Sequence, residues 1–341
     1  MPSIKLLLQV SLSLLMGGIF ASAIYYGTHP AVPSPSQPII IYANQMKHDL
    51  KLTLCKAIAQ AKETIFASYF GFTDQDVLAH IKKKAEHKIA IDVLYDPTSS
   101  APIHLPQSAR VTPIRRSGLM HRKILCIDGH TAYVGSANAT PTSLRVHDNV
   151  LLGLYHPECA RFLSSSQKEV GEFSLPDQKI SCFFLPESGA CALERLSSAI
   201  DCAQNTIRMA LFTFTHQPLG EALISAKRRG VKVQLALDAT TARGASRLLA
   251  IALVEAGIEV RVSVGQELFH HKWVLIDDEE FIMGSANWTK AAFEKNEDLL
   301  IFLSPLKKEQ QRFFNALWRR IENDTSKFAL ERNSLVYKVR S

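Results

Sequence analysis

The sequence predicts an α/β protein built from two copies of one unit, with mixed sheets flanked by helices. Apolar patterns typical of strands alternate with patterns typical of helices. The same series of patterns occurs twice along the 341 residues. Hydrophobic residues make up 47% of the chain, which is enough for a substantial core.

The repeat appears when the chain is shifted against itself. The second half contains an insertion between the two matched stretches, and within each stretch the register has no gap. The matched segments are residues 54–96 with 196–238, and residues 121–150 with 270–299. We therefore expect a first unit over residues 39–175 and a second unit over residues 179–335.

Each unit is expected to begin with a helix and a strand. Leu54, Ala57, Ile58 and Ala61 have the apolar spacing of a helix, and residues 64–72 read as the strand that follows. A second helix and strand come next and end at an aspartate. In the second copy we expect these elements over Gly220–Arg229 and Val231–Leu237, separated by Gly230 as a helix stop.

A hairpin and a final helix complete each unit. In the first copy the hairpin strands are expected over residues 123–127 and 131–134, joined by the turn-forming pair Asp128-Gly129. The final helices are expected over Pro157–Val170 and Leu306–Glu322. The boundary between the units is then expected near residues 174–179, before a strand over residues 180–185.

The first 27 residues differ from the rest. Lys5 precedes an apolar stretch over residues 6–24. The small residues Ala21-Ser22-Ala23 fit the site at which a signal peptide is cleaved. We expect residues 1–27 to be an export signal or an uncleaved membrane anchor. Residues 28–38 are rich in proline and read as a linker. Export predicts a periplasmic or secreted protein, or one that this segment anchors to a membrane.

The charge balance favours an anionic partner. Lysine and arginine total 39 against 32 acidic residues, a formal net charge of +7. This excess suits nucleic acid, phospholipid headgroups or a phosphate ester, although many proteins carry such a charge as a solvated surface. Arg115-Arg116 is the basic pair closest to the motif described next and is a candidate for contact with a polyanion.

The most specific feature is a motif that occurs once in each copy. A histidine, a lysine two residues later and an aspartate five residues beyond it are followed by Gly-Ser-Ala-Asn. The first copy contains His121, Lys123, Asp128, Ser136 and Asn138, and the second contains His270, Lys272, Asp277, Ser285 and Asn287. Alternation along a strand places histidine and lysine on one face and aspartate on the other. We therefore expect Asp128 and Asp277 to be structural, and His270 rather than His271 to serve the site.

These residue types suit phosphodiester chemistry. Lys123, Lys272, Asn138 and Asn287 offer donors to a phosphoryl group, with Ser136 and Ser285 in support. Two histidines suggest covalent catalysis, in which one attacks phosphorus and the other protonates the leaving alcohol. No metal or other cofactor is expected, and no obligate protein partner is inferred.

The paired motifs resemble the signature of the phospholipase D superfamily, and the resemblance covers nearly everything after residue 38. It implies two units packed about a pseudo-two-fold axis around one active site, with structural motif aspartates. It also implies that a downstream acid orients each histidine, for which Asp148 and Glu297 are the candidates, ten residues beyond each motif asparagine. By analogy with two-motif members, His121 is the nucleophile and His270 the acid.

The motif does not specify the alcohol on either side of the phosphate. Hydrolysis of phospholipid headgroups is favoured by the apolar N-terminal segment, by the basic charge, and by apolar residues before both histidines (Leu119-Met120 and Leu268-Phe269). The alternative is an exported endonuclease without sequence specificity, because the units are compact and a basic groove binds a nucleic-acid backbone.

Overall fold

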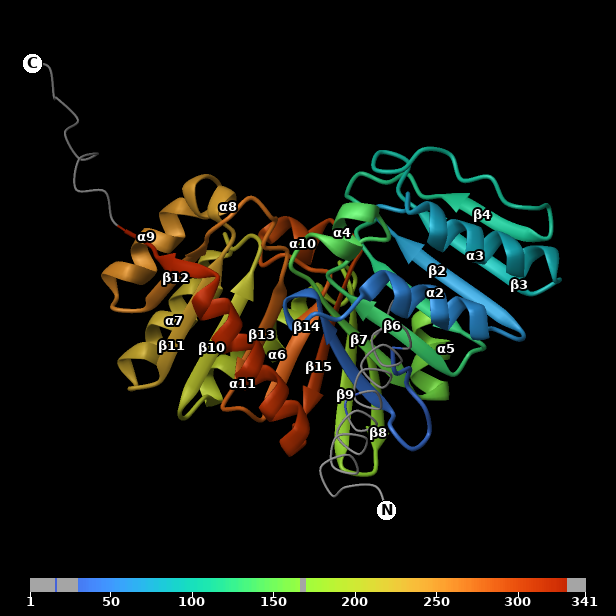
Figure 1. The fold of residues 1–341 in the computed structure, drawn as a ribbon. Helices are drawn as coiled ribbons and strands as arrows, with labels where there is room; N and C mark the ends of the chain where they lie inside the picture. Colours follow the sequence, from blue (N-terminus) through green and yellow to red (C-terminus); the bar gives the residue numbers. More distant parts are fainter. Residues whose placement is uncertain (1–15, 17–29, 166–169, 330–341) are drawn as a thin grey trace, which may run out of the picture.

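The protein is described by a computed structural model that covers residue 16, residues 30–165 and residues 170–329. The chain forms two mixed sheets flanked by helices, as predicted. Figure 1 shows the first unit, in blue to green, beside the second, in yellow to red.

The first sheet has seven strands in the order β1-β7-β6-β5-β2-β3-β4. Strands β2, β3 and β4 are parallel, and the other neighbours are antiparallel. The strands are β1 (Ile39–Ala43), β2 (Thr64–Tyr69), β3 (Ala90–Tyr95), β4 (Ala109–Pro113), β5 (Lys123–Ile127), β6 (Thr131–Gly135) and β7 (Val150–Tyr155).

The second sheet repeats this order and adds one strand at each edge: β16-β12-β11-β10-β13-β14-β15-β9-β8. Strands β10, β11 and β12 are its parallel members. The strands are β8 (Val170–Leu175), β9 (Gln178–Leu185), β10 (Thr206–Leu211), β11 (Lys232–Leu237), β12 (Glu259–Ser263), β13 (Lys272–Ile276), β14 (Glu280–Gly284), β15 (Asp298–Ser304) and β16 (Thr325–Lys327). The shared strand order confirms that the two halves have one fold.

The helices follow the repeat as well, except for η1 in the first unit and for α8 and α9, which lie in the longer connection of the second unit. In the first unit they are η1 (Asn44–Met46), α2 (Leu50–Gln60), α3 (Gln75–Glu86), α4 (Pro141–Arg145) and α5 (Pro157–Ser164). In the second they are α6 (Gly189–Cys202), α7 (Gln217–Arg228), α8 (Ala239–Arg243), α9 (Arg247–Glu255), α10 (Lys290–Glu294) and α11 (Lys308–Asn323).

The two units share one apolar core. Alternate residues of β5, such as Ile124 and Cys126, pack in a cluster with Trp273 and Leu275 of β13, while Leu125 packs in the outer core of its own unit. Helices α2 and α3 lie on the outer side of the first unit, and α7 and α9 lie on that of the second (Figure 1). Burial of one face of each sheet against the other unit fixes how the two motifs meet.

The predicted boundary between the units is wrong. Helix α5 ends at Ser164 rather than Val170, and residues 170–175 form β8, which pairs with β9 in the second sheet. Leu175 pairs with Gln178, so the two residues between them make a tight hairpin turn. Pairing of β8 with the edge of the second sheet places residues 170–175 in the second unit.

The segments before the first strand are described in part. The predicted signal or anchor over residues 1–27 lies outside the described residues apart from Met16. Within the predicted linker, the carbonyls of Pro30 and Ala31 accept hydrogen bonds from Lys56 Nζ and Tyr42 Oη at 2.8 and 2.7 Å, so this stretch is fastened to the first unit. Among the residues that the structure describes, no helix has the length and apolar character needed to cross a bilayer.

Candidate active site

The two motif histidines meet where the units exchange backbone hydrogen bonds. The amide of His121 donates to the carbonyl of Glu297 at 2.8 Å, and the amide of His270 donates to that of Asp148 at 3.0 Å. The carboxylates of Asp96 and Asp238 accept from the amides just before the histidines, at 3.1 and 3.2 Å. Each histidine is therefore positioned by both units.

Each histidine is oriented by a side chain of the opposite unit. His121 Nδ1 lies 2.8 Å from Asp298 Oδ1, and His270 Nδ1 lies 3.0 Å from Asn149 Oδ1. Asn149 Nδ2 donates to the carbonyl of Ser143 at 2.9 Å, which directs its oxygen towards His270. Both imidazoles therefore donate from Nδ1 and keep Nε2 for a substrate.

The prediction that Asp148 and Glu297 orient the histidines is wrong. These residues form the backbone bridges between the units, and side chains alternate along an extended chain, so the next residue faces the histidine. The carboxylate of Glu297 instead contacts Arg116 and, at 3.3 Å, Arg122. Burial and then the charges of Asp324 and Glu267 raise the pKa of Asp148 to about 7.

The prediction that the motif serines bind phosphate is also wrong. Ser136 Oγ donates to Asn149 Oδ1 at 2.7 Å, and Ser285 Oγ donates to Asp298 Oδ1 at 2.6 Å. Both side chains are buried. A hydroxyl has one proton to donate, so these serines support the groups that hold the histidines.

The lysines and asparagines remain as candidate phosphate ligands. Lys123 Nζ donates to the carbonyl of His121 at 2.5 Å, and Lys272 Nζ donates to that of His270 at 3.1 Å. An ammonium group can donate three hydrogen bonds. Each lysine uses one of them for this carbonyl, so donors are left for a phosphate. In Asn138, Oδ1 accepts from the Gly71 amide at 3.2 Å, while Oδ1 of Asn287 has no partner among the described residues.

Aromatic rings form equivalent walls in the two halves. The ring centroid of Phe70 lies 5.1 Å from that of His121 and 5.2 Å from Lys123 Nζ. Phe212 has the same two distances to His270 and Lys272. The aromatic faces attract the ammonium groups and exclude water from them.

Burial lowers the pKa of every cation in the site. It lowers the pKa of Lys123 to about 7 and, together with the charge of Lys123, brings the pKa of Lys272 well below its usual value. Burial and Lys123 also lower the pKa of His121, although Asp298 opposes them. For His270, burial and the charges of Lys272, Lys123, His121 and His147 all act downwards. The negative charge of a bound anion would oppose these shifts, which suits a site for a phosphate group.

We expect the protein to take up protons when it binds an anion. Sulfate bound between the lysines should raise their pKa values, so binding at pH 8 should take up about one proton or more. Affinity should fall as the pH rises above about 7, because Lys123 is then neutral in the empty site. Calorimetry in buffers of different ionisation enthalpy measures this uptake, and Lys123→Met should reduce it. Binding without proton uptake would contradict the assignment.

The motif aspartates lie at the hairpin turns, away from the histidines. The carboxylate of Asp128 accepts from the amides of Lys62, Glu63 and Thr64 at 2.8–3.1 Å. Asp277 accepts in the same way from residues 204–206 at 2.7–2.8 Å. Burial alone would raise the pKa of Asp128, but these amides bring it below its usual value. Both aspartates fix the loop between a helix and the following strand.

Asp128→Ala should therefore destabilise the fold without removing the chemistry. Loss of an acceptor shared by three amides should lower the free energy of unfolding by about 1–3 kcal/mol, as measured by denaturant titration. Asp128→Asn, which keeps one acceptor oxygen, should cost less. The rate per folded molecule should stay close to that of the unchanged protein. A loss of activity much larger than the loss of folded protein would place Asp128 in the site.

His271 faces the core shared by the units rather than the site. Its Nε2 lies 2.8 Å from Gln45 Oε1, and its ring packs against Phe269 and Trp273. Burial lowers its pKa to about 3, so the ring is neutral. The structure thus separates two adjacent histidines into one in the site and one in the core.

Comparison with known proteins agrees with this geometry. The family described as "Cardiolipin synthase, PLD-like domain" matches residues 54–169 and 196–318, one match for each unit. The chain belongs to the phospholipase D superfamily. It is accordingly a phosphodiester-active enzyme of that superfamily.

Individual relatives cover different parts of the chain. Mitochondrial cardiolipin hydrolase of Xenopus laevis is 29% identical over 47% of this chain and 75% of its own length. Phospholipase D of Rickettsia felis is 28% identical over 47% of this chain and 80% of its own. The solved phosphatidylserine synthase of Haemophilus influenzae covers 87% of this chain and 88% of its own, with a TM-score of 0.68 and 14% identity, and so shares the fold.

Proposed function

We propose that the enzyme hydrolyses phospholipid headgroup phosphodiesters through a phosphohistidine intermediate, without a metal ion. The observation that carries this proposal is the pair of imidazoles whose Nδ1 atoms are held by acceptors of opposite units. This leaves Nε2 of each imidazole for the substrate, in a site that also contains the buried Lys123 and Lys272, as two-step transfer of a phosphoryl group requires.

In the first step, Nε2 of His121 attacks phosphorus, and the bond from phosphorus to the leaving alcohol breaks. The alcohol oxygen takes the proton that Nε2 of His270 carries once the anionic substrate is bound, since the negative charge of the substrate opposes the burial and the cations that lower the pKa of this imidazole. In the second step, neutral His270 accepts a proton from water, and the water oxygen displaces His121 from phosphorus. The products are an alcohol and a phosphate monoester. Asp298 supports His121 as the nucleophile because its negative charge stabilises the imidazole as positive charge develops there.

Two observations support a lipid substrate. The names of two relatives, a cardiolipin hydrolase and a phospholipase D, are those of enzymes that act on lipids. In this chain Leu119, two residues before His121, is 41% exposed. Met120 and Phe269 are buried, so these two apolar residues pack in the fold instead of meeting an acyl chain. Export and contact with a membrane remain predictions from residues 1–27 and from the net charge.

The test is to offer the purified protein labelled phosphatidylcholine and cardiolipin, and single- and double-stranded DNA and RNA, with a chelator present. We expect release of phosphatidate from at least one lipid. Cleavage of nucleic acid alone would replace the lipid proposal by the nuclease alternative. Activity that the chelator abolishes would contradict the metal-free mechanism.

A further inference from the structure

A third histidine lies beside the active site, in the segment that leads to Asn149. The ring centroid of His147 lies 6.3 Å from that of His270. The amide of His147 donates to the carbonyl of Thr142 at 3.0 Å, and its carbonyl accepts from Asn149 Nδ2 at 3.4 Å. The residue that orients His270 therefore also holds the backbone of His147 next to the site.

The ring of His147 is available to a ligand. It makes no hydrogen bond to any residue that the structure describes, and its side chain is partly exposed, whereas His270 is 7% exposed. Burial and the charge of Lys272 lower the pKa of His147, so its imidazole is neutral at neutral pH. A neutral imidazole has one N–H donor and one nitrogen acceptor. His147 can therefore both donate a hydrogen bond to a ligand and accept one.

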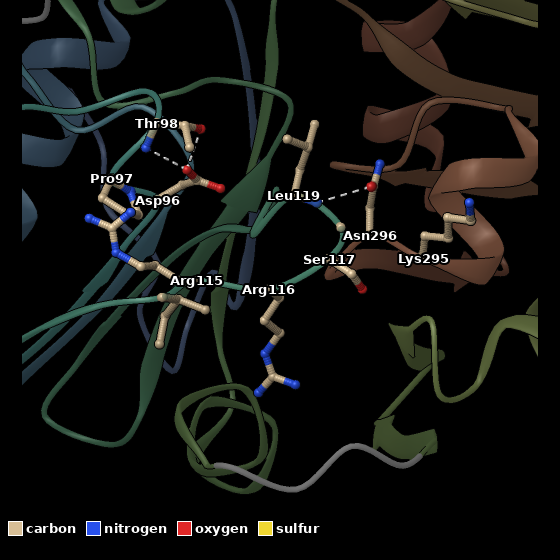
Figure 2. Close-up of a pocket in the computed structure, with 11 residues that line it drawn as sticks. Asp96, Pro97, Thr98, Arg115, Arg116, Ser117, Leu119, Lys295 and Asn296 are labelled. Atoms are coloured by element: carbon tan, nitrogen blue, oxygen red, sulfur yellow. Dashed lines mark hydrogen bonds between the residues drawn. The ribbon is translucent and has the colours of Figure 1, made fainter.

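The other half of the site has a different residue at this position. Under the repeat His147 corresponds to Asn296. Figure 2 shows the side chain of Asn296 bonded to Leu119, whose amide donates to Asn296 Oδ1 at 3.1 Å. Asn296 is thus used to join the two units, and the ring of His147 has no such bond among the described residues. The two sides of the site differ here, although the motif histidines, lysines and asparagines are the same.

This difference lies on the side of the leaving alcohol. In an in-line displacement the nucleophile and the leaving group are on opposite sides of phosphorus. In the proposed mechanism His121 is the nucleophile and His270 protonates the leaving oxygen, so the headgroup extends from the oxygen beside His270. A side chain next to the imidazole of His270, as His147 is, is therefore placed to contact the headgroup.

We infer that His147 binds a hydroxyl group of the leaving headgroup, and that the enzyme prefers phospholipids with a polyol headgroup such as glycerol. This inference rests on the proposed function and names its substrate class. A hydroxyl group both donates and accepts a hydrogen bond, which matches the two nitrogens of a neutral imidazole. A trimethylammonium group, as in choline, does neither.

The experiment compares two short-chain lipids whose uncharged headgroups have the same three carbons, phosphatidylglycerol and phosphatidyl-1-propanol. They differ in the two free hydroxyl groups of glycerol. Unchanged enzyme should have a kcat/KM about fivefold higher for phosphatidylglycerol, as expected for one hydrogen bond to a substrate hydroxyl. His147→Leu should bring the ratio close to one, mainly by lowering the value for phosphatidylglycerol. His147→Gln, which retains a donor and an acceptor, should keep most of the preference.

Asn296→Leu is the matched control, because it makes a similar change at the repeat position in the other half. It should leave the ratio as it is in the unchanged enzyme, whatever it does to the individual values. A general disturbance of His270 by the substitution of His147 would lower both values together. The ratio therefore reports the contact with the headgroup and not the condition of the site.

Binding is measured separately from turnover. In a His121→Ala background, the ratio of the Kd values for the two lipids should depend on His147 in the same way. A binding preference that requires His147, without turnover of either lipid by the unchanged enzyme, would support the contact and overturn the proposed function. The same ratio in the unchanged enzyme and in His147→Leu, with turnover intact, would refute the contact alone. Neither turnover nor a binding preference would refute both.

Discussion

His121→Ala and His270→Ala should each lower kcat by at least about 10³-fold, the loss expected when a nucleophile or its proton donor is removed. A p-nitrophenyl phosphodiester separates the roles, because p-nitrophenolate leaves without a proton. With this substrate, His270→Ala should still release one equivalent of p-nitrophenolate in a burst and then stall as the phosphoenzyme. His121→Ala should give no burst. Rapid-mixing absorbance measures both.

His271→Phe is the matched control, since it changes the adjacent histidine, which faces the shared core. It should retain most of kcat, whatever it costs in stability. A burst in His121→Ala and none in His270→Ala would reverse the two roles. A rate like that of the unchanged enzyme in either alanine variant would remove the two-histidine mechanism.

Asp298→Asn should lower kcat by about 10²-fold or more, because it keeps an acceptor for His121 Nδ1 but removes the charge that stabilises a cationic imidazole. Stability should change less than activity, since the amide is close to the carboxylate in shape. The rate of p-nitrophenolate release in the first turnover measures the effect on His121 directly. A normal burst rate would show that the charge of Asp298 is not used in the attack.

Asn149→Asp makes the complementary change at His270. A carboxylate beside this imidazole should raise its pKa, which burial and the nearby cations hold well below the usual value. If His270 donates the proton, the pH above which kcat/KM falls should move up by about one unit or more. Ser136→Ala, which loses the hydroxyl behind Asn149, is the control for disturbance of geometry alone. An unchanged pH profile in Asn149→Asp would contradict the role of His270 as the acid.

Features that depend on neighbours in the sequence were predictable. The spacing of His121 from Lys123, the first residue of β5, and the turn at Asp128-Gly129 are local features, so the sequence alone is enough to predict them. The choice of His270 over His271 followed from strand alternation and agrees with the structure. The repeat also predicted that the two halves share one fold, and the matching strand orders of the two sheets confirm this.

The partners of the histidines were not predictable in this way. The resemblance directed attention to Asp148 and Glu297, whereas the structure uses Asn149 and Asp298, one residue further along. A shift of one residue in an extended chain reverses the face of every side chain, and only the backbone bridges between the units fix that register. The repeat does contain Asn149 and Asp298 at matched positions, which was the available signal.

The sequence by itself determined the family, the paired motif and the chemistry of the residues in it. Tertiary structure decided which acceptor orients each histidine, that the serines stand behind those acceptors, and that residues 170–175 belong to the second sheet. The physical reason is that these features arise from contacts between segments far apart in the chain, whose faces are set by the packing of the two sheets on their shared core.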